Sequence, residues 1–234
     1  MSLKYLVGLG GLVFALVGCG NGGSDAHEAV CFDNTFYAEG AQIKIVYELS
    51  GSSSGKEAWS STVTSVNATL DGVSGLVQRR EEHTPEGLST RHVFTSEKLL
   101  SAGVVARHGE TRYNSVAPLL SSVVERYAPP FVDARAELRT GESATYPKQG
   151  ERTAMGSAGG PVVTPFSDFV TVTFVGQESV SVPAGVYQAC RYTTFTQSTG
   201  VSVTQWLHRG VVVRQESRGT VHALINGTFN GLPL

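Results

Sequence analysis

Residues 42–49, QIKIVYEL, alternate apolar and polar side chains and decide the fold class. In an extended chain the two kinds of side chain would lie on opposite sides: Ile43, Ile45, Tyr47 and Leu49 against Lys44 and Glu48. This period of two is typical of a half-buried β-strand. The stretches 168–176, DFVTVTFVG, and 219–227, GTVHALING, repeat it, and no stretch of comparable length has a helical period. The sequence therefore predicts an all-β protein.

Turn-forming residues, mostly glycine, separate these patterned stretches from one another, as at 51–55, 71–72 and 85–87. Short strands between frequent turns favour an antiparallel sheet built of hairpins over βαβ units. We expect a curved sheet or incomplete β-barrel of about ten strands. A candidate short helix at 119–126 is disfavoured by its neighbour Pro118 and by its β-branched valines.

Residues 148–165, KQGERTAMGSAGGPVVTP, show the weakest pattern in the folded part of the chain. They are either a long surface loop or a boundary between an N-terminal and a C-terminal sheet. The strands after this stretch comprise only about 65 residues, which would form a marginal core by themselves. We therefore expect one β-rich domain over 30–234, with a long loop at 148–165.

The amino terminus carries one positive charge in residues 1–4, followed by 13 uncharged residues, 5–17. A membrane-spanning helix needs about 20 apolar residues, so this run fits the core of a signal peptide better. The next residues, Leu16-Val17-Gly18-Cys19, resemble the lipobox of bacterial lipoproteins. That resemblance implies a signal peptide over 1–18, diacylglycerol on the Cys19 thiol, and acylation of the new amino terminus by a fatty acid such as palmitate.

Residues 19–29 would then be a lipidated, flexible tether, because the glycine-rich start of this segment cannot bury apolar surface. Two or more acyl chains hold a protein firmly at a bilayer, so the membrane is the first expected partner. In the lipoprotein family, an aspartate after the lipidated cysteine marks retention at the inner membrane. Here that residue is Gly20, which implies the outer membrane, with the domain facing the periplasm.

Cleavage before Cys19 would remove one basic residue, leaving 216 residues with 17 basic and 20 acidic side chains. A net charge of about −3 and the lack of a basic stripe argue against a nucleic-acid partner. The remaining cysteines, Cys31 and Cys190, would lie in an oxidising compartment, which favours a disulfide over two buried thiols. No histidine lies near them at metal-ligand spacing, so we expect neither a metal nor another cofactor.

Two hairpins are predicted in the C-terminal part. In 180–192, VSVPAGVYQACRY, the order Val182-Pro183-Ala184-Gly185 suits a type I turn. In 203–217, VTQWLHRGVVVRQES, a strand should turn at 209–210, and Trp206 is placed to cap the open end of a sheet or barrel.

These segments resemble a group of bacterial periplasmic lipoproteins of uncharacterised function. The residues that carry the resemblance are Val180 to Arg191, Trp206 to Arg214, the Asn226-Gly227 pair as a turn, and 127–143, YAPPFVDARAELRTGES. Those lipoproteins are themselves similar to incomplete β-barrel carriers, in which a curved antiparallel sheet surrounds an apolar cavity for acyl chains. The present sequence lacks clear lid helices, and a fold does not by itself assign a function.

A search for catalytic residues identifies none. GSSSG, 51–55, matches the G-x-S-x-G nucleophile motif, but a strand-like run follows it instead of a helix, which predicts a hairpin loop. Neighbours on a strand point to opposite faces, so Glu81 and Glu82 cannot share a site. His92 could meet His108 across strands, or His83 could meet one of these glutamates, but surface positions are the simpler interpretation.

The sequence is therefore interpreted as a non-catalytic lipoprotein that binds an apolar ligand, such as a lipid, or an envelope protein, through residues it does not identify. One alternative is a periplasmic hydrolase acting on envelope material, with a site assembled from residues far apart in the chain. Another is an envelope scaffold that adds a partner strand at a sheet edge.

Overall fold

The computed structural model describes residues 31–86, 90–101, 103–114, 121–155 and 160–234. The expected signal peptide, Cys19 and the tether lie outside these residues. No helix in the described part has the length and apolar composition needed to cross a membrane. Thirteen strands are described: β1 (Gln42–Gly51), β2 (Gly55–Leu70), β3 (Val73–Pro85), β4 (Arg91–Ser101), β5 (Val104–Asn114), β6 (Ser121–Asp133), β7 (Ser143–Met155), β8 (Val162–Val182), β9 (Gly185–Thr196), β10 (Val201–His208), β11 (Val211–Ser217), β12 (Thr220–Phe229) and β13 (Leu232–Pro233).

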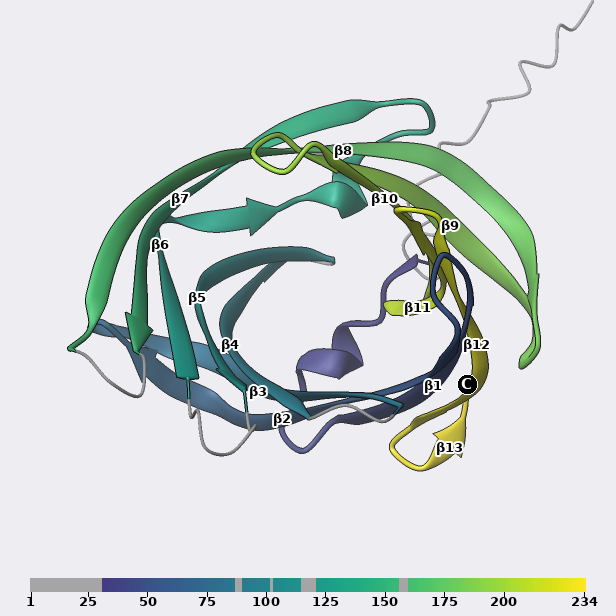
Figure 1. The fold of residues 1–234 in the computed structure, drawn as a ribbon, viewed down its shortest axis with the longest axis horizontal. Helices are drawn as coiled ribbons and strands as arrows, with labels where there is room; N and C mark the ends of the chain where they lie inside the picture. The colour runs from purple at the N-terminus through teal and green to yellow at the C-terminus, as the bar shows by residue number, and fades with distance from the viewer. Residues whose placement is uncertain (1–30, 87–89, 102, 115–120, 156–159) are drawn as a thin grey trace, which may run out of the picture.

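The strands form one antiparallel sheet in chain order, and β1 also pairs with β12 (Figure 1). That pairing runs from Ile43↔Phe229 to Gly51↔Thr220 and closes β1–β12 into a barrel. The all-β, antiparallel, single-domain prediction is confirmed. The barrel expected to be a curved sheet or incomplete is closed, because β1 pairs with β12.

The expected long loop at 148–165 is also wrong, because β7 extends to Met155 and β8 begins at Val162. Most of this part of β7 is exposed or half-buried, with no fully buried side chain to produce an apolar period. A strand with two polar faces cannot be recognised by hydrophobic alternation. The candidate helix at 119–126 is likewise strand from residue 121 onward.

The predicted turn at Pro183-Ala184 is confirmed and closes the long β8–β9 hairpin. The end of this hairpin lies along the outside of β11 and β12 in Figure 1. There the Ala184 N–H donates to the Leu224 carbonyl oxygen at 3.0 Å. Val180, Val182 and Ala189 belong to the same buried cluster as Val213 and Leu224, so the hairpin covers one side of the barrel wall.

The N-terminal segment lies inside the ring of strands (Figure 1). Cys31 and Cys190 form a disulfide with 5.4 Å between their Cα atoms, and both are fully buried. A short 3₁₀ helix, η1 (Asn34–Tyr37), follows, and Phe36 packs edge-on against Phe229 with 4.7 Å between ring centroids. The second 3₁₀ helix, η2 (Arg135–Glu137), connects β6 to β7.

Candidate functional site

The barrel encloses a cavity of about 510 Å³, which we call the barrel cavity. Strands β1–β5 and β10–β12 line it, together with the turn before β11. It adjoins a second cavity of about 180 Å³ beside η1, and the two share Arg79, Arg107 and Gly210. The lining residues are Ile45, Tyr47, Glu57, Trp59, Arg79, Glu81, His83, Arg91, Arg107, Gln205, Gly210, Val211, Val212, Gln215 and His222.

One wall of the barrel cavity is a row of four directly paired residues on β1–β4. Ile45 pairs with Trp59, Trp59 with His83, and His83 with Arg91. Directly opposed residues in an antiparallel sheet project from the same face. The row therefore places an aliphatic, an indole, an imidazole and a guanidinium side by side, and we call it the β1–β4 row.

A second row lines the cavity from β10–β12. Gln205 pairs with Gln215, and Gln215 pairs with His222. The Gln205 amide donates to the Gln215 carbonyl oxygen at 2.8 Å. This wall is therefore polar without a permanent charge of its own.

Glu57 of β2 links the two rows. Its carboxylate lies 3.3 Å from His222 Nε2 and 3.7 Å from His83 Nδ1. These two imidazoles lower the pKa of Glu57 to about 2. Burial would lower the pKa of His83, but contacts with Glu57 and Glu81 outweigh it and raise that pKa. Glu57 is therefore stable as a carboxylate. The adjacent His83 keeps its proton to a higher pH than an ordinary histidine does.

A continuous chain of ion pairs, the ionic network, leads away from His83 along the inner side of β3–β7. The Arg79 guanidinium lies 3.7 Å from Glu81 and 2.9 Å from Glu97, and Glu97 also lies 3.0 Å from Arg107. The same alternation continues through Glu110, Arg112, Glu125, Lys148 and Arg152. Each carboxylate of the network contacts at least one cation, so none of these carboxylates is left unpaired.

The prediction that Glu81 and Glu82 cannot share a site is confirmed. Glu81 contacts Arg79 and His83 of the barrel cavity, whereas Glu82 contacts His92 and Arg80. The suggested meeting of His92 with His108 is wrong, because His92 pairs with Tyr113 across β4 and β5. His83 does meet Glu81, as one interpretation of the sequence allowed.

Ser53 lies in the β1–β2 hairpin loop, as predicted, and its hydroxyl oxygen lies 3.3 Å from that of Thr220. In the described residues no hydroxyl or thiol is hydrogen-bonded to an imidazole. Nor do three or more histidine, cysteine, aspartate or glutamate side chains come together there in an arrangement that could hold a metal ion. The hydrolase alternative thus gains no supporting geometry from this part of the chain.

Two expectations for the C-terminal motifs are wrong. Trp206 does not cap a barrel end, because it packs in the wall between the guanidiniums of Arg191 and Arg214, 5.2 and 5.3 Å from its ring. Asn226-Gly227 is not a turn, because it lies within β12 and pairs with β1. A Cβ on Gly227 would clash with the Leu234 side chain, so this glycine makes room for Leu234. The predicted turn at 209–210 is confirmed.

Comparisons with known proteins find two solved structures with weak similarity to this chain. No family model matches the chain, and no curated protein matches it. A protein with a YmcC-like fold from Bacteroides fragilis aligns over 86% of this chain and 99% of its own, with 13% identity and a TM-score of 0.40. A beta-barrel-like protein of the domain of unknown function DUF1849 from Brucella abortus aligns over 82% and 99%, with 11% identity and a TM-score of 0.34.

Sequence reasoning missed Glu57, Arg91 and His222 as members of one site. Each lies on a strand at a position that faces the barrel interior. The sequence contains one indication of this: a charged or polar residue stands where the alternation predicts an inward side chain. Inward charges in a barrel indicate a polar interior. They do not indicate which of them meet, because that depends on strand pairing.

Proposed function

We propose that this protein is a non-catalytic binding module of the cell envelope and that it holds its ligand in the barrel cavity. The observation that carries the proposal is the barrel cavity itself, about 510 Å³ in volume and lined from eight strands. Small-molecule sites are typically concave, about 300–1,000 Å³ in volume, and furnished with a few well-placed polar groups. The volume fits that description, and the lining is more polar than usual, since nine of its fifteen residues are charged or polar.

The lining does not fit the wholly apolar ligand expected from the sequence. Ile45, Tyr47 and Val211 offer apolar surface, but Arg91, His83 and the glutamines offer polar groups in the same cavity. Burying an acyl chain there would remove water from the Arg91 guanidinium and the Gln215 amide N–H groups, which have no partner among the described residues, at a cost of about 1–3 kcal/mol each. The proposed ligand is therefore a small molecule with one polar and one apolar part.

Filling the barrel cavity tests this proposal. Gln215→Trp places an indole in the cavity, whereas Glu216→Trp places the same indole on the next residue of β11, outside the cavity lining. We expect native mass spectrometry of protein isolated from the envelope to show a bound small molecule in wild type and Glu216→Trp. We expect none in Gln215→Trp. A wild-type protein without any adduct, or an adduct unaffected by Gln215→Trp, would contradict the proposal.

We propose further that acyl chains on Cys19 hold the domain at the outer membrane, which the lipobox and Gly20 support. Cys19→Ser is expected to abolish incorporation of radioactive palmitate and to release the protein from the membrane fraction, because serine cannot carry the thioether-linked lipid. Gly20→Asp is the control: the label should stay while the protein moves to the inner membrane. Undiminished labelling of Cys19→Ser would refute the anchor.

A scaffold role through strand addition has one supporting feature. Beyond Thr173, β8 still pairs with β9, but no residue of β7 pairs with it. This edge carries a bulge at Gly176 and the exposed charge of Glu178, two devices by which proteins prevent strand addition. The barrel cavity is therefore the better supported site.

A further inference from the structure

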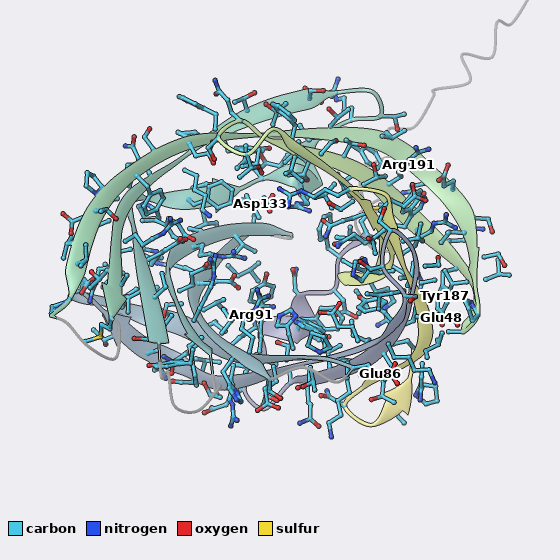
Figure 2. The ribbon with its side chains drawn as sticks, viewed as in Figure 1. Glu48, Glu86, Arg91, Asp133, Tyr187 and Arg191 are labelled. Atoms are coloured by element: carbon cyan, nitrogen blue, oxygen red, sulfur yellow. A yellow bond between two sulfur atoms is a disulfide. The ribbon has the colours of Figure 1, made fainter. Side chains whose placement is uncertain are left out.

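Arg91 is a solvent-exposed cation that lines the barrel cavity, and no partner for it is described. It begins β4, lines the barrel cavity and lies within the ring of strands (Figure 2). In the described part of the chain, its guanidinium forms neither an ion pair nor a hydrogen bond. The arginines of the ionic network, such as Arg79 and Arg107, each contact at least one carboxylate. Arg91 thus leaves a permanent positive charge in the cavity uncompensated by side chains.

The side-chain carboxylate and amide oxygens around the barrel cavity are already engaged. Both oxygens of Glu57 face imidazoles, and the two oxygens of Glu81 face Arg79 and His83. The Gln215 carbonyl oxygen accepts from Gln205. These contacts neutralise the carboxylates that would otherwise repel an anion at Arg91.

Apart from the buried Nδ1 of His222, which has no hydrogen-bond partner, the free polar groups of the barrel cavity are donors. Besides the Arg91 guanidinium, the Gln215 amide N–H groups and the Trp59 indole N–H have no acceptor among the described residues. An indole N–H and an amide N–H₂ can only donate. A site with occupied acceptors and free donors selects a ligand that brings oxygen acceptors, and a guanidinium favours oxyanions, which it can bind with two parallel hydrogen bonds.

The β1–β4 row adds an apolar surface next to this cation. Trp59 and Arg91 are separated by one strand, or about 10 Å between their main chains. His83 lies between them and stacks edge-on with Trp59, with 6.1 Å between ring centroids. His83 and Arg91 pair directly across β3 and β4, so their side chains project from the same face of the sheet. A single small molecule can therefore contact the indole and the guanidinium together.

We propose that the ligand is a small organic acid whose carboxylate or phosphate oxygens pair with Arg91 and whose apolar part lies against Trp59 and Ile45. This rests on the proposed function, because it assigns a chemical class to the molecule held in the barrel cavity. Arg91 is the residue that determines the class. Trp59 contributes affinity for the apolar part, whatever the charge of the ligand.

Calorimetric titration with three probes of similar shape tests this assignment: phenylacetate, phenyl phosphate and the neutral phenylacetamide. We expect the wild-type protein to bind one or both acids more tightly than the amide. Arg91→Gln should weaken acid binding by about 10- to 100-fold, the loss typical of one charge-assisted contact. Arg80→Gln, the same change outside the cavity lining on β3, should leave binding unchanged. The better acid identifies the carboxylate or the phosphate as the preferred group.

Thermal unfolding provides the check on folding. The melting temperature of Arg91→Gln should equal that of wild type, because the side chain has no protein partner to lose. Equal affinity for acid and amide, or acid binding unaffected by Arg91→Gln, would overturn the assignment. If Gln215→Trp still abolished such binding, the cavity would remain the binding site and only the ligand class would be wrong. If no probe bound, the molecule found by native mass spectrometry would decide: an acid supports the assignment and a neutral molecule overturns it. Absence of both overturns the assignment together with the proposed function.

Discussion

Replacing Cys31 and Cys190 together by serine is expected to lower the free energy of unfolding by up to about 5 kcal/mol, the entropic value of a cross-link that closes a loop of this length. The two residues are 159 positions apart, so the reduced unfolded chain gains a large number of conformations. For a domain of about 200 residues this corresponds to a fall of about 10–20 °C in the melting temperature. Circular dichroism of a soluble form that begins at Gly20 measures it.

Reduction distinguishes the bond from the packing of the two side chains. A reducing agent should lower the melting temperature of the wild type to that of the double variant and should leave the double variant unchanged. If the double variant melts within about 2 °C of wild type, the bond contributes less than about 1 kcal/mol and the prediction is wrong.

The same bond should order the N-terminal segment inside the barrel. Asp33 is joined to Arg209 by an ion pair, Gly103 donates to Asn34, and Phe36 packs on Phe229. These contacts are short-range, and only the disulfide attaches the beginning of the segment covalently to the wall. Because η1 borders the smaller cavity, its release in the double variant would also change access to the barrel cavity.

The sequence predicted those parts of the fold in which apolar side chains alternate. β1 and β12 were recognised in this way, and Pro183 located the hairpin between β8 and β9. β7 was missed because its inward side chains, such as Lys148 and Arg152, belong to the ionic network and not to an apolar core. Hydrophobic periodicity detects only strands that bury apolar side chains on one face.

The candidate site was beyond sequence reasoning for a different reason. The β1–β4 row depends on the register of three strand pairs, and β2 and β3 change register three times before β3 ends. A shift of one residue would turn His83 out of the barrel and Glu82 into it. Glu57 and His222 meet only because β12 closes on β1, and nothing in either strand specifies that closure.

Replacing Glu97 by glutamine is expected to destabilise the protein by about 3 kcal/mol, because two guanidiniums would then face a neutral amide in a buried site. The Glu97 side chain is 1% exposed and receives Arg79 and Arg107 at 2.9 and 3.0 Å. The amide keeps the shape of the carboxylate, so packing is conserved and the charge alone is removed. The value lies at the lower end of the range for broken buried pairs, because Arg107 is partly exposed. Urea unfolding measures it.

Glu82→Gln is the matched control, since Glu82 contacts Arg80 and is more than one-third exposed. Its loss should be within about 1 kcal/mol, as for other exposed ion pairs. A loss for Glu97→Gln no greater than this control would contradict a buried network that depends on charge balance.

A second substitution separates charge from geometry. Arg79 contacts Glu97 on one side and the ring of Tyr37 on the other, where its guanidinium carbon lies 5.5 Å from the ring centroid. If Glu97→Gln destabilises the barrel by leaving positive charge uncompensated, then adding Arg79→Met should restore part of the lost stability, because it removes one of the two cations and keeps an aliphatic side chain against Tyr37. If the network acts only as a set of independent contacts, the two losses should add instead. Restoration would show that Glu97 stabilises the barrel by compensating the charges of Arg79 and Arg107 together.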